Sequence, residues 1–312
     1  MKNTDNFRSF LESVRMSLAA TFRGCRIEET TGTKNNGIRL AGLAVRPQGS
    51  KVAPVVYMEQ YFQEYREGRP FEDVFAEIAG TYKKAFEGKT VYIDPEKLND
   101  FGFVSDKICF TLVNRELNRE LLAAAPHRDF HGLSIVYYIL LKDVAENLGT
   151  VTVSDDLMRI WGVDEALLYD IASNNTPVLN RGCVEPLMDE VCRIKGCGVP
   201  DGVRECFSYR DFDITIARGE DVMYMASTVS QTKGSSVILY RNFLEKMSEK
   251  LGSFFALPST IHEFVIAPGR IEDAEAMSQL VKRVNSTCVA ADDILSDGCF
   301  FYDMNSHELK EI

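Results

Sequence analysis

Two amphipathic segments joined by a short link constrain the fold of the N-terminal part more than any other feature. Each begins at a proline and ends at a glycine, Pro54 to Gly68 and Pro70 to Gly88, which is the usual order at the two ends of a helix. Apolar and aromatic residues recur at spacings of three and four along both segments. The pattern predicts two antiparallel helices whose aromatic stripe belongs to the core.

A helix and a hairpin are expected ahead of that pair. Thr4 or Asp5 is a good N-cap for a helix that runs to Phe22. The dipeptide Asn36–Gly37 then marks a tight turn, because both residue types tolerate positive φ. We therefore expect residues 1–90 to form an N-terminal unit of helix, β-hairpin and helix pair.

The remainder, residues 91–312, alternates strand-like and helix-like segments without a steady βαβ rhythm. "KICFTLVN", "LSIVYYILLK" and "SSVILY" resemble strands, and "RNFLEKMSEKL" resembles a helix. This order favours an α+β fold, with the N-terminal unit followed by a larger mixed sheet with helices. Residues 176–206 are rich in Gly and Cys, and we expect an irregular excursion there.

Charge and hydropathy exclude several classes of function. The 35 Lys and Arg residues face 46 Asp and Glu residues, a net charge of −11, which disfavours non-specific binding to nucleic acid. No stretch approaches the roughly 18 uncharged apolar residues of a membrane span, and the start lacks the pattern of a signal peptide. We expect a cytoplasmic protein that does not bind membranes and whose eight cysteines are reduced.

Four of these cysteines, Cys183, Cys192, Cys197 and Cys206, are candidate zinc ligands. Structural zinc sites usually take their ligands in pairs two to four residues apart. Here the cysteines are separated by eight, four and eight residues, so unrelated thiols are favoured over a metal site.

Asp211 and Asp213 could face the same side of a strand, as the carboxylates of a Mg²⁺-dependent nuclease do. Such nucleases usually carry a Glu-x-Lys on the following strand, and none follows here. A solvated strand face is therefore the favoured interpretation. The chain also lacks the P-loop, dinucleotide-binding and hydrolase-elbow motifs, so we expect no cofactor.

The stretch "ALPSTIHEFVIAPG" places Ser259, Thr260, His262 and Glu263 close together. In a strand, His262 and Glu263 would point to opposite faces, and Ser259 would lie in a turn after Pro258. A catalytic Ser–His pair is therefore disfavoured. Ser259, Thr260 and His262 remain a candidate binding corner, and His262 remains a candidate catalytic residue beside Asp211 and Asp213.

Several segments together resemble a known family. "NNGIRLAGLAVRPQGSKVAPVVYMEQYFQEYREG", "FTLVNRELNRELL" and "LPSTIHEFVIAP" are similar to an uncharacterised domain-of-unknown-function family, number 5688, of anaerobic gut bacteria. The resemblance covers most of the chain and implies no activity, cofactor or catalytic residue.

Two functional hypotheses follow. The first is a non-enzymatic protein-interaction protein with an unknown protein partner, encoded on a mobile genetic element. The alternative is a hydrolase or metal-dependent nuclease of unfamiliar type that uses Asp211, Asp213 or His262.

Overall fold

The structure is a computed structural model that describes residues 2–50, 53–87, 95–142, 148–199, 202–217, 219 and 222–312. These residues form two compact units. The smaller comprises the described parts of Met1–Lys34, Ile38–Asp94 and Lys142–Gly149, and the larger those of Asn35–Gly37, Pro95–Leu141 and Thr150–Ile312. The boundary expected near residue 90 lies outside the described residues and stays a prediction. No helix among the described residues is long and apolar enough to span a membrane.

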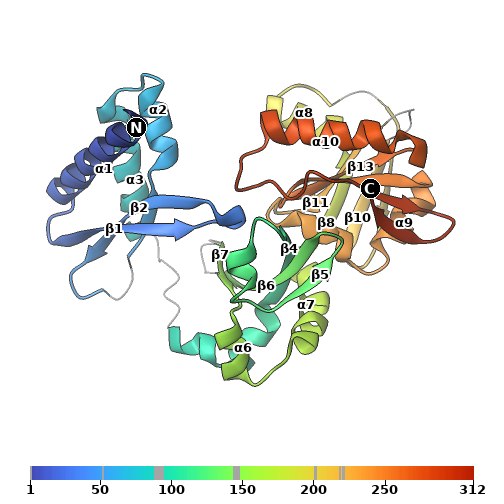
Figure 1. Ribbon diagram of the computed structural model, residues 1–312, viewed down its shortest axis with the longest axis horizontal. Coiled ribbons are helices and arrows are strands. Elements are labelled where there is room, and N and C mark those ends of the chain that lie inside the picture. Colours follow the sequence, from blue (N-terminus) through green and yellow to red (C-terminus); the bar gives the residue numbers. More distant parts are fainter. Residues whose placement is uncertain are drawn as a thin grey trace. The chain divides into compact units, whose positions relative to one another are not determined.

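The smaller unit packs three helices against an antiparallel three-stranded sheet (Figure 1). Its elements are α1 (Lys2–Thr21), β1 (Cys25–Thr33), β2 (Arg39–Pro47), β3 (Val55–Tyr57), α2 (Glu59–Arg66) and α3 (Phe71–Glu87). The core is apolar and includes the fully buried Val14, Leu18, Leu43 and Ile78. The expected helix, hairpin and helix pair are thus present in the expected order.

The start of the first helix of that pair was predicted wrongly. Residues 55–57 form β3, which pairs with β2, and α2 begins only at Glu59. The β-branched Val55 and Val56 suit a strand, and the backbone N–H of Met58 still donates to Ala41 O at 3.0 Å. Pairing with β2 therefore outweighs the helix-start signal of Pro54.

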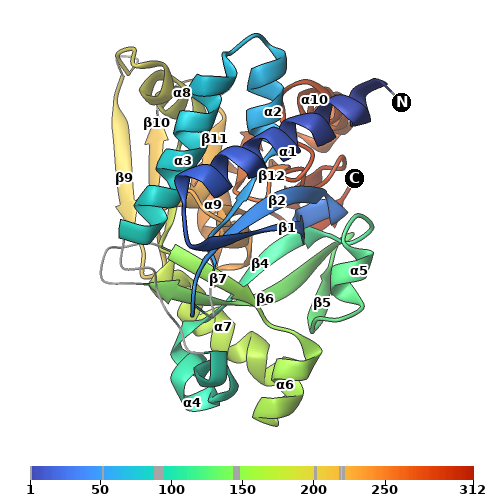
Figure 2. The ribbon, with the colours of Figure 1, turned by 90° about the vertical axis from the view of Figure 1, so that its left-hand side faces the viewer.

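The larger unit contains two sheets. The eight-stranded sheet has the order β15-β14-β12-β13-β11-β8-β10-β9, and β8 and β10 are parallel neighbours within it. Its strands are β8 (Gly182–Pro186), β9 (Arg204–Ser208), β10 (Phe212–Ala217), β11 (Tyr224–Thr228), β12 (Phe254–Thr260), β13 (Glu263–Pro268), β14 (Phe300–Asp303) and β15 (Glu308–Glu311). β9 forms one outer edge of this sheet (Figure 2).

The second sheet has four strands in the order β4-β6-β5, with β7 also paired to β6. They are β4 (Ile108–Asn114), β5 (His127–Phe130), β6 (Leu133–Lys142) and β7 (Leu148–Thr152). The α-helices of this unit are α4 (Phe101–Val104), α5 (Arg119–Leu122), α6 (Asp155–Trp161), α7 (Glu165–Leu179), α8 (Leu187–Lys195), α9 (Phe243–Leu251) and α10 (Ala274–Cys288). The predicted α+β class is confirmed, and the large mixed sheet is accompanied by a separate smaller one.

Short 3₁₀ turns, η1 (Asn35–Gly37), η2 (Pro95–Asn99), η3 (Ser105–Lys107), η4 (Gly234–Leu239) and η5 (Ile271–Asp273), complete the elements. The segment "SSVILY", expected as a strand, lies mainly in η4 and is largely buried. A short buried apolar run carries no periodicity that separates a strand from a helical turn, which explains this error.

The expected irregular excursion at residues 176–206 is also wrong. Most of it is regular, because it contains the end of α7, the strand β8, the helix α8 and the start of β9. β8 lies in the interior of the eight-stranded sheet, between β11 and β10. A Cβ at Gly182 would stand 2.9 Å from Phe212 Cβ, so this glycine is required by close packing and does not mark a loop.

Candidate functional site

A cavity of about 710 Å³ opens in the larger unit among α7, the turn between β9 and β10, and the residues from the end of η4 into α9. Its volume lies within the range of pockets that hold small molecules, roughly 300–1,000 Å³. The lining combines basic, acidic, aromatic and amide side chains. It is therefore a candidate binding site for a polar small molecule.

Arg181 holds the turn that forms one wall of this cavity. Its guanidinium donates to the backbone carbonyls of Tyr209 and Arg210 at 2.7 Å each, and to the Asp213 carboxylate at 2.7 and 2.8 Å. The Tyr209 N–H also donates to Phe212 O at 2.9 Å. The turn is thus fixed from within, which leaves the side chains of Arg210 and Asp211 to line the cavity.

A second part of the lining is the beginning of α9. Asn242 precedes the helix with φ of 61° and ψ of 13°, and its side chain does not cap the helix. A helix N-terminus without a side-chain cap presents N–H groups with a partial positive charge. Arg241, Asn242 and Lys246 line the cavity from this segment.

The charges around the cavity favour an anion. Three cations line it, Arg210, Arg241 and Lys246, against two carboxylates, Asp170 and Asp211. Arg210 and Asp211 approach each other only to 3.7 Å, and Lys246 pairs with a glutamate of its own helix. Within the described part of the chain, Arg241 forms no hydrogen bond or ion pair. A net positive lining is notable in a chain whose net charge is −11.

Aromatic side chains supply a flat apolar surface beside these cations. Tyr209 and Phe212 form a tilted pair with ring centroids 5.1 Å apart, and Tyr169 lines the cavity from α7. Arg128 lies 3.8 Å from the Tyr169 ring centroid, which holds that ring in place. Aromatic faces of this kind can stack on a planar ligand group.

Asp211 and Asp213, which were predicted to share one face of a strand, have different surroundings in the structure. Asp211 precedes β10 and lines the cavity, whereas Asp213 lies within β10 and is bonded by Arg181 and Ser208. Arg181 is the main cause that lowers the pKa of Asp213 to about 2. Asp213 is therefore an ion-paired carboxylate that holds the turn.

His262 lies elsewhere in the larger unit, in the two-residue turn between β12 and β13. Three strand spacings separate β13 from β10 in the sheet, which is about 14 Å at roughly 4.8 Å per spacing. Its Nδ1 accepts the Lys233 N–H at 3.2 Å, and its Nε2 lies 3.4 Å from Asp293 Oδ1. The structure thus does not bring His262 together with Asp211 and Asp213.

The predicted binding corner is a β-hairpin end. Ser259 belongs to β12, beyond an irregularity in its pairing with β13, so its expected position in a turn is wrong. Its hydroxyl donates to Glu263 Oε1 at 3.5 Å, and Thr260 Oγ1 accepts the His262 N–H at 3.0 Å. Burial raises the pKa of Glu263. Ser259 and Thr260 thus act within the hairpin, while His262 faces Lys233 and Asp293.

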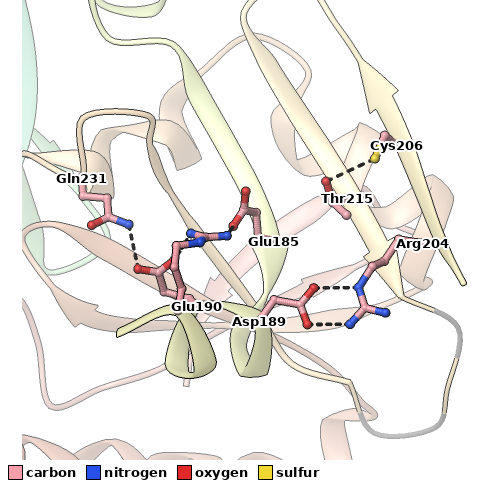
Figure 3. A network of polar contacts seen from close by, with 8 residues as sticks. Glu185, Asp189, Glu190, Arg204, Cys206, Thr215 and Gln231 are labelled. Atoms are coloured by element: carbon pink, nitrogen blue, oxygen red, sulfur yellow. Dashed lines mark hydrogen bonds and ion pairs between the residues drawn. The ribbon is translucent and has the colours of Figure 1, made fainter. Parts of the chain in front are cut away.

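The four candidate zinc cysteines lie on different elements. Cys183 is in β8, Cys192 in α8 and Cys206 in β9, and Cys197 follows α8. In Figure 3, Cys206 contacts Thr215 at 3.6 Å on the neighbouring strand. No group of three or more His, Cys, Asp or Glu side chains in the described ranges is placed to hold a metal ion.

Ion pairs and hydrogen bonds tie this region together. Asp189 of α8 and Arg204 of β9 form a bidentate pair with two bonds of 2.7 Å (Figure 3). Gln231 donates to Glu190 at 2.9 Å. Asp189 and Glu190 are both buried, and Arg204 lowers the pKa of Asp189. The network joins α8 to the edge strand and to the loop after β11.

Sequence reasoning found Asp211 of the cavity but missed its cations. Arg210 is adjacent to Asp211 in the sequence. Arg241 comes thirty positions after Asp211, between η4 and α9. An asparagine before an amphipathic helix, as at Asn242, is a usable signal for a helix start. The position of this helix start beside the β9–β10 turn depends on tertiary packing, which no local pattern encodes.

These features define an α+β protein with a ligand-sized cavity of net positive lining. Residues 7–304 match a family of unknown function, DUF5688, and the chain belongs to this family. It is the family that the sequence segments resemble. No curated protein and no solved structure matches the chain.

Proposed function

We propose that the larger unit binds a small molecule that carries an anionic group and a planar ring. The observation that carries this proposal is the side chain of Arg241, which has no partner among the described residues and lines a cavity with two further cations. Arginine recognises phosphate and carboxylate groups through paired hydrogen bonds. The anionic group would contact Arg241 and Arg210, and the ring would lie against Tyr209.

Binding without turnover is the simplest role for this cavity. Its lining contains neither histidine nor cysteine. The Ser173 hydroxyl donates to the Tyr169 carbonyl at 2.7 Å, so it has no general base as its partner. The support for a hydrolase or nuclease is weaker, because Asp211, Asp213 and His262 have separate partners.

Ligand titration with Arg241→Gln tests the proposal. Calorimetry with AMP, adenosine and inorganic phosphate separates the contribution of the ring to the binding affinity from that of the anionic group. We expect AMP to bind more tightly than the other two, and Arg241→Gln to weaken it about ten- to a hundredfold, as the loss of a charge-assisted hydrogen bond would. Arg8→Gln is the matched control, since Arg8 is an exposed arginine of α1 in the smaller unit. Equal AMP affinities of the two variants, or stronger binding of adenosine, would contradict the proposal.

We also propose a protein partner that binds beside β9. The apolar side chains of Met188, Ile194, Val199 and Val203 are 58%, 76%, 48% and 57% exposed, and they belong to α8 and the segment that leads to the edge strand. Neighbouring exposed apolar side chains are a frequent feature of interaction surfaces. Affinity purification from the native host should recover a partner with the wild type and lose it with Ile194→Asp. Val178→Asp, at an equally exposed position of α7, should retain the partner.

We propose that the protein acts in the cytoplasm of an anaerobic gut bacterium and is encoded on a mobile genetic element. The cytoplasmic part is supported by the cysteines, which are all free thiols, as expected in a reducing compartment. The origin is supported only by the family resemblance. Cell fractionation of the native host would test the location, and the genes that flank this one would test the origin.

A further inference from the structure

Lys233 is a half-buried lysine without a counter-charge in the described part of the chain. It lies between β11 and η4, and its ammonium nitrogen is 5.0 Å from the centroid of the Tyr138 ring. No carboxylate in the described ranges forms an ion pair with it. Burial lowers the pKa of Lys233. Buried lysines are normally paired, so this one requires an explanation.

Polar groups on β4 and η4, which pack against each other, are incompletely bonded. Tyr138 lies opposite Cys109 in the β4–β6 register, and its hydroxyl accepts a bond from Asn180 Nδ2 at 3.0 Å. Thr111 is two residues from Cys109 on β4 and therefore shares that face of the sheet. The hydroxyl groups of Thr111 and Ser235 are buried and have no hydrogen-bond partner among the residues that the structure describes. Such groups mark places where a bound molecule or water completes the bonding.

The loop that carries Lys233 is held in an unusual conformation. Gln231 and Lys233 both have φ of 53°, a region that costs non-glycine residues free energy and is enriched at functional sites. The Lys233 N–H donates to His262 Nδ1, which fixes the backbone on the inner side. A Cβ at Gly234 would stand 2.3 Å from His262 O. The backbone therefore cannot relax without disturbing the β12–β13 turn.

The loop that carries Lys233 lies at the surface of the larger unit. Gln231 and Thr232 are exposed and Lys233 itself is partly exposed. The side chains of His262 and Asp293, beside the loop, keep 34% and 37% of their surface accessible. His262 of the predicted binding corner thus contacts the backbone of the lysine loop.

We infer that Lys233 is a reactive amine that condenses reversibly with the aldehyde or ketone group of a small molecule. The nitrogen lone pair attacks the carbonyl carbon and gives a carbinolamine. Loss of water, which carries the carbonyl oxygen and two hydrogens, leaves an imine between the nitrogen and that carbon. Only an uncharged amine can attack, and desolvation without a carboxylate partner raises the uncharged fraction of a lysine. The buried hydroxyl groups nearby would bind the polar remainder of the carbonyl compound.

Reductive trapping tests this inference. The folded protein is incubated at neutral pH with pyruvate or propanal and cyanoborohydride, and the modified lysines are identified by peptide mass mapping over time. Lys250 is an internal control, because it also lies over an aromatic ring, 3.7 Å from the centroid of Phe207, but is exposed. We expect Lys233 to be modified more than about tenfold faster than Lys250, as for a desolvated amine.

Two further measurements exclude trivial explanations. Urea-unfolded protein should lose the preference for Lys233, and Lys233→Arg should remain folded by circular dichroism and lose the fast phase of modification. Equal or slower modification of Lys233 than of Lys250 in the folded protein would overturn the inference, as would a fast phase that persists in Lys233→Arg. AMP binding in the cavity should be unchanged in this variant, since Lys233 does not line it.

Discussion

The interiors of the two units differ in what they bury. In the smaller unit, aromatic and aliphatic side chains from all three helices meet β2, and the buried Tyr82 hydroxyl donates to Leu43 O. In the larger unit, Lys233 is half-buried without a carboxylate partner, and the buried hydroxyl groups of Ser134 and Ser235 have no hydrogen-bond partner among the described residues. Unpaired polar groups inside a protein cost stability. Among the described residues, Glu59 Oε2 is a buried side-chain atom of the smaller unit without a hydrogen-bond partner, and the other such atoms belong to the larger unit. The core of the smaller unit is mainly apolar, and the larger unit buries more polar groups that stability does not require.

A second contrast lies within the larger unit, between two carboxylates. Asp189 is buried but meets Arg204 in a bidentate pair, and its pKa is lowered. Glu263 receives a long bond from Ser259, and burial raises its pKa. The folded protein therefore stabilises the charged form of Asp189 and destabilises the charged form of Glu263. Polar burial in this unit is therefore of two kinds, paired and unpaired.

The largest effect is expected for Gly234→Ala at the lysine loop. The added Cβ would meet Ser227 Oγ at 2.2 Å, His262 O at 2.3 Å and Thr228 N at 2.7 Å. Two of these atoms belong to the backbone and cannot move aside, so we expect a loss of about 5 kcal/mol or more in the free energy of unfolding. Urea denaturation measures it. A loss below about 1 kcal/mol would show that the loop is less tightly held than the structure indicates.

The next effect concerns the apolar core of the smaller unit. Phe10 is 3% exposed and packs among other aromatic rings, so Phe10→Ala should cost about 3–5 kcal/mol. Met16→Ala on the same helix removes a side chain that is 64% exposed and should change stability by less than about 0.5 kcal/mol. AMP affinity of the larger unit should be the same in both variants. A parallel loss of AMP binding in Phe10→Ala would contradict the separation of stability from function.

That apolar core is also the part of the fold most visible in the sequence. The spacing of Val74, Ile78 and Tyr82 predicts the buried face of α3, and all three are fully buried. The turn at Asn36–Gly37 has both residues at positive φ, as predicted. Amphipathic helices and turn dipeptides are local signals, which is why these features could be predicted.

The candidate site could be predicted only in part, because it depends on contacts between distant segments. Asp211 was recognised as a carboxylate of interest, but its neighbours Arg241 and Lys246 come from α9. Lys233 belongs to no recognisable sequence motif. Its ammonium group lies against the Tyr138 ring because η4 packs on β4. Local patterns cannot distinguish such a lysine from an exposed one.

The contrast between the carboxylates predicts opposite pH dependences. Because the pKa of Glu263 is raised in the folded state, its ionised form costs stability above that raised pKa. The cost disappears as pH falls below the ordinary value of 4.5. Glu263→Gln should therefore be more stable than the wild type at pH 7, and this difference should shrink by pH 4.

Asp189→Asn should change the stability at pH 7 in the opposite direction to Glu263→Gln. The lowered pKa of Asp189 contributes stability above its ordinary value of 3.8, and this contribution is lost as pH falls through the folded-state pKa. The variant should be less stable than the wild type at pH 7, and the two should converge in acid. Urea denaturation at several pH values measures both variants. If both substitutions shift stability in the same direction at pH 7, the distinction between paired and unpaired burial is wrong.

The smallest effect is a gain, and it lies in the smaller unit. Gly80 is inside α3, and a Cβ added there would meet no atom within 4 Å. Glycine in the middle of a helix costs roughly 0.5–1 kcal/mol relative to alanine, so Gly80→Ala should raise the free energy of unfolding by that amount. Glycine to alanine should thus raise the stability at Gly80 and lower it at Gly234. A Cβ has free space at the first site and meets backbone atoms at the second. A loss of stability in Gly80→Ala, measured by urea denaturation, would mean that the surface of α3 at Gly80 is covered in solution.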